Sequence, residues 1–184
     1  MTQYYYVASS LPLLLYDNKA PIRLSEFHQC VSTLLSPSDA SKVLSATIFA
    51  AMPVDSLSPL GACYWYYEKG LRNELIKLRA LSLGVDPKSH YCDYEENPFV
   101  VEVAQQAFKS QSPLIGEGIL NSWRWHTIDT LESGHYFDVD YFTAYHLKLQ
   151  ILERKELFEQ QSGKDNFNNL YHDILKTDPN WSGV

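Results

Sequence analysis

The sequence predicts an all-α protein, and three observations support this prediction. Serine–proline pairs at 36–37 and 58–59 are typical helix starts, because serine caps the first turn and proline fits the first helical position. Apolar residues recur at steps of three and four over 59–83 and form one continuous helical stripe. Paired alternating segments joined by short turns, which would predict β-hairpins, do not recur.

The first third of the chain predicts three short helical segments. Residues 4–8 (YYYVA) are ambiguous, since their aromatic rings favour a strand while the leucines of 11–15 favour a buried helix; we predict a helix. Ser25 is the expected cap of a short helix around Phe27. The next helix is expected to run from the first serine–proline pair to about residue 52, before a proline.

The clearest helix is the one over 59–83, which Gly84 is expected to end. Within it, Glu68 and Arg72 lie four residues apart in the favourable order for a helical ion pair. The polar stretch 88–96 is predicted to be an exposed connection, and the asparagine–proline pair at 97–98 starts another helix.

The second half of the chain predicts two longer helices. One is expected over 114–131, and a break follows in which Gly134 takes a left-handed conformation and Asp138 caps the next helix. That helix is expected to run to about residue 161. Apolar residues over 167–174 predict one last short helix.

These elements predict one helical domain over 1–184, in an orthogonal or bundle-like arrangement. The polar segment 88–96 would divide it into two sub-lobes, 1–87 and 97–184. Hydrophobic residues make up 45% of the chain and charged residues 20%, which is the balance of a folded rather than a disordered protein.

The charge distribution argues against a nucleic-acid partner. The formal net charge is −7, so bulk electrostatics repel phosphate backbones. Basic residues do gather near the ends of two predicted helices; these are Lys77, Arg79, Lys148, Arg154 and Lys155. We interpret them as solvent-facing cations that the helix dipole favours.

Cysteine usage and hydropathy indicate an intracellular protein. Cys30, Cys63 and Cys92 are odd in number and contain no CxxC spacing, which favours a reducing compartment. No secretory signal is visible, and no apolar run approaches the roughly 18 residues of a membrane span. We therefore expect a cytoplasmic location and no direct membrane span.

No catalytic, nucleotide-binding or metal-binding motif occurs in the sequence. The closest approach to a metal site is His90 with Cys92 beside Asp93, Glu95 and Glu96. Structural zinc normally takes four ligands at organised spacings, so we interpret this segment as an exposed acidic loop. We predict no metal, no cofactor and no catalytic residue.

Two further groups of residues permit more than one interpretation. Histidines and acids of the second half could be imagined as an acid–base set; they are His126, His135, His146, Asp129, Glu132, Asp138 and Asp140. Nothing in the sequence fixes their geometry, and we expect no catalytic role. Trp123 and Trp125 resemble a stacking platform, but packing in a core or between lobes is the interpretation we favour.

Four segments together resemble a bacterial family of no established activity whose genes lie among those for V-type (A-type-like) ATP synthase subunits. They are 3–12 (QYYYVASSLP), 35–39 (LSPSD), 120–125 (LNSWRW) and 134–154, which begins with GHYFD and ends with LKLQILER. The last of these is the most specific, and the resemblance covers most of the chain.

A second resemblance concerns 71–85 (LRNELIKLRALSLGV), which is similar in style to a recurring helix of the V-type coupling subunit, the protein known as d in eukaryotes. That protein is all-helical and funnel-like, sits on the membrane rotor ring and receives the foot of the central stalk. The present chain is shorter than the V-type coupling subunit, which has three helical repeats. The resemblance implies a non-catalytic coupler whose partners are central-stalk and membrane-ring subunits, peripheral to the inner membrane through the complex.

Cations on the two strongest helices are the expected partner-binding residues, since charges set the register of a docking surface. They are Arg72, Arg79, Lys148 and Arg154. An assembly factor or regulatory protein of the same complex is the alternative function, and a small helical enzyme without a recognisable motif is the third.

Overall fold

The computed structural model describes residues 2–49, 54–86 and 97–158, and every regular element in these ranges is helical. The elements are α1 (Thr2–Ser10), α2 (Leu24–Leu34), α3 (Pro37–Ser45), the short 3-10 helix η1 (Val54–Ser56), α4 (Pro59–Leu83), α5 (Pro98–Phe108), α6 (Pro113–Glu132) and α7 (Val139–Leu157). The all-α prediction is confirmed.

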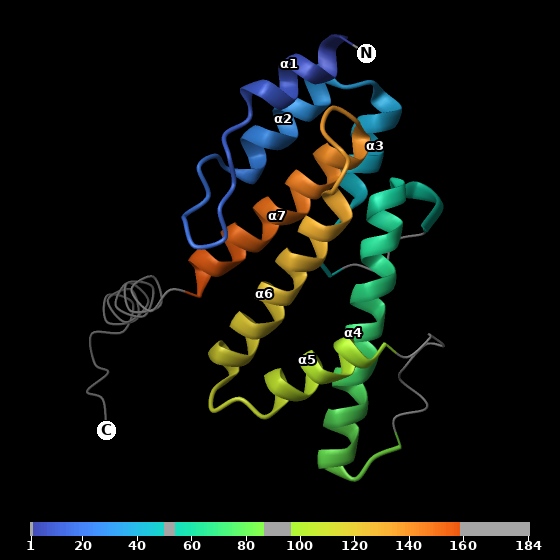
Figure 1. Ribbon diagram of the computed structural model, residues 1–184, viewed down its shortest axis with the longest axis vertical. Helices are drawn as coiled ribbons and strands as arrows, with labels where there is room; N and C mark the ends of the chain where they lie inside the picture. Colours follow the sequence, from blue (N-terminus) through green and yellow to red (C-terminus); the bar gives the residue numbers. More distant parts are fainter. Residues whose placement is uncertain (1, 50–53, 87–96, 159–184) are drawn as a thin grey trace, which may run out of the picture.

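Three long helices, α4, α6 and α7, form the body of the molecule (Figure 1). The α7 helix contacts α2, α3, α4 and α6, which explains why its apolar face is wider than one neighbour requires. The shorter α1, α2 and α3 lie around α7 at one end, whereas α5 crosses between α4 and α6 at the other end (Figure 1). None of the helices in the described ranges has the length and hydrophobicity of a bilayer span.

Two hydrophobic cores follow from this arrangement. The larger core joins α1, α2, α3 and the first turns of α4 to α7, with Phe27, Phe142 and Leu149 fully buried in it. The smaller core joins the second half of α4 to α5 and the first half of α6 around Leu71 and Ala104. Both cores contain residues from before 88 and after 96, so they do not follow the division into 1–87 and 97–184.

Several helix boundaries are set locally, as predicted. The side chains of Ser36 and Ser58 accept hydrogen bonds from the third residue of the helices that follow them. Gly84 and Gly134 adopt positive φ angles of 68° and 96°, and the Asp138 side chain caps α7. The predicted helix over 59–83 has the observed bounds of α4.

The start of α2 differs from the prediction. This helix begins at Leu24, and Ser25 lies inside it rather than capping it. The first N–H group is satisfied from α7 instead, because the Leu24 amide donates to the Glu153 carboxylate at 2.7 Å. Glu156, one turn further along α7, accepts from the Ala20 amide at 2.8 Å. Carboxylates that are distant in sequence thus replace the local cap.

The helix predicted for residues 4–8 is confirmed, because these residues lie in α1. The leucines of 11–15, which favoured that helix, lie beyond its end, and the carbonyl of Pro12 accepts a hydrogen bond from the Tyr145 hydroxyl at 2.9 Å. The third helix ends at Ser45 instead of continuing to 52. The Gln150 side chain holds the chain after it, donating to the Ala46 carbonyl and accepting from the Ile48 amide. The predicted tail helix over 167–174 lies outside the described residues.

Candidate functional site

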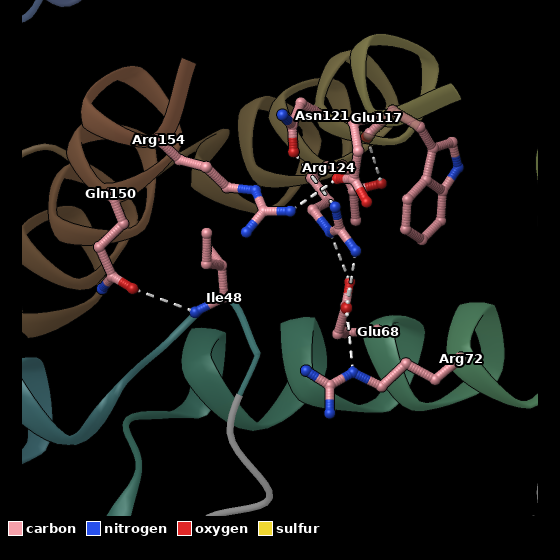
Figure 2. Close-up of polar contacts among 10 residues, drawn as sticks. Ile48, Glu68, Arg72, Glu117, Asn121, Arg124, Gln150 and Arg154 are labelled. Atoms are coloured by element: carbon pink, nitrogen blue, oxygen red, sulfur yellow. Dashed lines mark hydrogen bonds and ion pairs between the residues drawn. The ribbon is translucent and has the colours of Figure 1, made fainter. Parts of the chain in front are cut away.

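A buried ion pair joins α4 to α6 between the two cores. The Arg124 guanidinium donates two hydrogen bonds to the Glu68 carboxylate, at 2.8 and 2.9 Å, and both side chains are 4% exposed. The Asn121 side chain accepts a third bond from Arg124, at 3.1 Å. Figure 2 shows Arg72 reaching the same carboxylate, at 3.2 Å, along α4. The two bonds from Arg124 make its pairing with Glu68 bidentate, which is the geometry in which arginine pairs most strongly with a carboxylate.

The pair between Glu68 and Arg72 was predicted from its spacing and is confirmed, but the stronger partner was not foreseen. Arg124 lies 56 residues away, and no short-range pattern signals such a contact. Burial by itself would lower the pKa of the Arg124 guanidinium, but its bonds and attraction to Glu68 outweigh burial and raise the pKa. The group therefore stays charged.

Three guanidinium groups lie around the ring of Phe49. We call these three arginines the arginine cluster. The central carbons of Arg72, Arg124 and Arg154 lie 5.7, 5.0 and 4.4 Å from the ring centroid. Arg154 also donates to the Glu117 carboxylate at 2.8 Å (Figure 2). These contacts hold the chain after α3 against α4, α6 and α7 through cation–π attraction.

The buried Tyr64 hydroxyl lies close to Glu68, Arg72 and Arg124, and no described residue forms a hydrogen bond of good geometry with it. Burial, reinforced by the charge of Glu68, strongly raises the pKa of Tyr64. The phenol is therefore neutral at physiological pH and is not poised as a base or a nucleophile. We interpret its environment as structural.

Lys148 on α7 forms a second charged cluster with α6. Its ammonium group lies 2.6 Å from an Asp129 oxygen, also binds Glu132, and lies 5.5 Å from the Trp125 ring centroid. Burial acts to lower the pKa of Lys148, but hydrogen bonds to the two carboxylates outweigh it and raise the pKa. With a side chain only 12% exposed, Lys148 is a structural cation.

The four expected partner-binding residues thus have different environments, and the structure does not bring them together on one free surface. Arg72, Lys148 and Arg154 form ion pairs within the chain. Arg79 is exposed and lines a cavity of about 270 Å³ among α4, α5 and α6. The interpretation of Lys148 and Arg154 as solvent-facing cations is corrected accordingly.

Reversing the charge of Lys148 is therefore expected to destabilise the protein. A Lys148→Glu variant brings three carboxylates together in a poorly solvated site, which should lower the free energy of unfolding by about 3 kcal/mol. Arg79→Glu is the matched control and should change it by about 0.5 kcal/mol or less. Urea unfolding followed by circular dichroism measures both; equal stability of the two variants would contradict the assigned role of Lys148.

The histidines and acids of the second half do not assemble into one acid–base set. His135 contacts Asp138 at 2.6 Å and Asp140 at 3.9 Å beside the cap of α7, and the pKa of His135 is raised chiefly by its hydrogen bond to Asp138. Asp129 and Glu132 bind Lys148 instead.

The other candidates are placed as follows. Within the described parts of the chain, no group of three or more His, Cys, Asp or Glu residues could hold a metal ion. His90 and Cys92 lie outside those parts. Trp125 is buried in the larger core and Trp123 packs against the smaller one, so the packing interpretation of this pair is confirmed.

Four exposed aromatic residues form a surface feature that the sequence did not reveal, which we call the aromatic patch. Tyr5 and Tyr6 come from α1, and Tyr136 and Phe137 come from the turn between α6 and α7. The rings of Tyr5 and Phe137 lie 4.9 Å apart, and each contacts its exposed neighbour in sequence. Clustered exposed aromatic rings are typical of protein interfaces.

Comparisons with known proteins assign no family. The chain matches no protein-family model, and searches of curated proteins and of solved structures found no match. The resemblance to the V-type ATP synthase-associated family therefore remains a prediction.

Proposed function

We propose that this protein is a non-catalytic component of a V-type ATP synthase or ATPase. In this proposal it joins the central stalk to the membrane rotor ring, in the manner of the V-type coupling subunit, and lies in the cytoplasm at the inner membrane through its complex. The proposal rests on the family resemblance of the sequence. The single structural observation that supports it is the aromatic patch.

Charge and burial explain why the patch is the surface we favour for the partner. Arg72, Lys148 and Arg154 are used within the chain, so they are poorly suited to bind another protein. The patch instead presents tyrosine rings, such as those of Tyr6 and Tyr136, each with a polar hydroxyl group. A tyrosine side chain buries a large area at an interface and loses little conformational entropy when it binds. It rests on α1 and the α6–α7 turn, and Tyr4 of α1 is anchored by its ring contact with buried Phe142.

The first test is recovery of the complex from native membranes. The full chain carrying a tag is isolated in mild detergent, and its partners are identified by mass spectrometry. Stalk and ring subunits at near-equal stoichiometry support a stable subunit. Recovery only from cells still assembling the complex supports the alternative, an assembly factor. Absence of every ATP synthase subunit in both cases contradicts the proposal and leaves the small helical enzyme as the remaining hypothesis.

The patch makes a sharper prediction within the same experiment. A Tyr6→Ser, Tyr136→Ser double variant should reduce recovery of partner subunits at least about tenfold, because buried interface tyrosines often contribute about 2 kcal/mol or more each. Tyr66→Ser is the control, since Tyr66 is an exposed tyrosine on α4 away from the patch. Equal recovery with both variants would show that the partner binds elsewhere.

A further inference from the structure

Two histidines face each other between α2 and α7. His28 Nε2 lies 2.9 Å from His146 Nε2, and the rings meet edge to face. His146 is 2% exposed and stacks on Phe27, whereas His28 is partly exposed at the surface of α2. The contact spans 118 residues of sequence and is one of the polar links between these helices.

Hydrogen bonding determines which atom carries the proton. His146 Nδ1 lies 2.8 Å from the carbonyl oxygen of Val43, which can only accept, so Nδ1 carries hydrogen. In the neutral ring His146 Nε2 is then an acceptor, and it takes the Nε2–H of His28. The Gln150 amide nitrogen, at 3.3 Å, also points a donor at the same atom. While both rings are neutral, His28 and Gln150 therefore both donate to His146 Nε2.

No negatively charged side chain among the described residues pairs with His28 or His146. His28 is the one titratable side chain in the described residues whose charge acts on His146, and no described carboxylate forms an ion pair with either ring. Asp39 on α3 bonds to Tyr4 and Ser36, and Glu153 on α7 bonds to the Leu24 amide. The remaining ionisable groups on these helices are Glu26, Cys30, Lys42, Asp140, Tyr141, Tyr145, Lys148, Arg154, Lys155 and Glu156.

We propose that the His28–His146 pair is an acid-sensitive contact that releases α2 from α7 when His146 becomes protonated. Protonation gives His146 Nε2 a hydrogen, so the 2.9 Å contact is kept only if His28 changes tautomer and accepts at its own Nε2. The Gln150 N–H group at 3.3 Å then faces another donor, and the buried charge of His146 has no described counter-ion. Movement of α2 away from α7 lets water reach the ring. The device is independent of the proposed function.

The size and sign of the effect follow from linkage. Burial, together with the neighbouring His28, lowers the pKa of His146 from 6.5 to about 4, although its bond to Val43 acts in the opposite direction. Between pH 6.5 and about pH 4, His146 is protonated when α2 has moved away from α7 but stays neutral while the two helices are packed together. The separation of α2 from α7 therefore becomes more favourable as pH falls. Between about pH 7.5 and pH 5 the equilibrium for release should increase about 30-fold.

Hydrogen exchange measured by mass spectrometry on the full chain tests this proposal. After correction for the intrinsic exchange rate at each pH, protection of the α2 amides should fall about 30-fold from pH 7.5 to pH 5. Protection of α5, which lies in the smaller core, should fall much less. An equal fall in α2 and α5 would show global unfolding instead and overturn the proposal, as would unchanged protection of α2.

Two variants separate this pair from other titrating groups. In His146→Gln the amide can donate to Val43 and accept from His28 without titrating, so the loss of α2 protection at low pH should disappear. In His28→Gln the charge that helps to lower the pKa of His146 is absent, and the amide can accept from a protonated His146, which should reduce the same loss. The control His126→Gln alters an exposed histidine on α6 and should behave like the unmodified protein. A full loss of protection in both pair variants would overturn the proposal.

Discussion

Replacing Leu149 with aspartate is expected to abolish the folded state. Leu149 is fully buried in the larger core, in the middle of α7. The change removes an apolar side chain whose loss alone typically costs about 2–5 kcal/mol, and it adds an uncompensated buried charge that costs several more. Because a domain of this size is stable by about 5–15 kcal/mol, the sum exhausts most or all of its stability.

Circular dichroism and thermal unfolding measure this outcome. The variant should lose its cooperative transition and most of its helical signal. Leu157→Asp is the matched control on the same helix, since Leu157 is 73% exposed and should tolerate the change within about 1 kcal/mol. A cooperative transition in Leu149→Asp near that of the unmodified protein would mean that α7 is not the central core helix.

Removing Arg124 is expected to cost about 3–5 kcal/mol of unfolding free energy. The Arg124→Ala variant leaves the buried Glu68 carboxylate with Arg72 as its remaining cation, at 3.2 Å and from a half-exposed side chain. It also leaves Asn121 without its donor. Urea unfolding at pH 7 should show a large decrease in midpoint with little change in slope.

A double variant tests whether the cost arises from the unpaired charge. Glu68→Leu combined with Arg124→Met removes both charges, and its stability should recover to within about 2 kcal/mol of the unmodified protein. Arg23→Ala is the control, because the Arg23 side chain of the Arg23–Glu156 pair is 63% exposed and should contribute at most about 1 kcal/mol. Equal effects of Arg124→Ala and Arg23→Ala would contradict the buried-pair interpretation.

Local sequence signals predicted most of the helices because the physics that ends a helix acts over a few residues. Ser58 accepts from the amide three residues later, and Gly84 takes a left-handed conformation that other residues avoid. The same reasoning failed at Ser25, where the actual cap comes from Glu153, 129 residues away from the Leu24 amide.

The candidate site was less predictable than the fold. The sequence identified Arg72 and its pairing with Glu68, since that ion pair spans one helical turn. It also identified Lys148 and Arg154 as candidates, but it predicted that they face solvent. The carboxylates that pair with them lie on another helix, which the sequence does not reveal. A basic residue in the last turns of a helix has the same local pattern whether it faces water or a neighbouring α-helix.

By itself, the sequence determined the all-α class, the bounds of α4 and the caps of α3, α5 and α7, since these depend on contacts between residues a few positions apart. Only the tertiary structure decided that Glu68 meets Arg124, that His28 meets His146, and that aromatic residues from α1 and the α6–α7 turn form one patch. These pairings depend on how the helices cross, and side-chain packing across the whole chain sets that geometry.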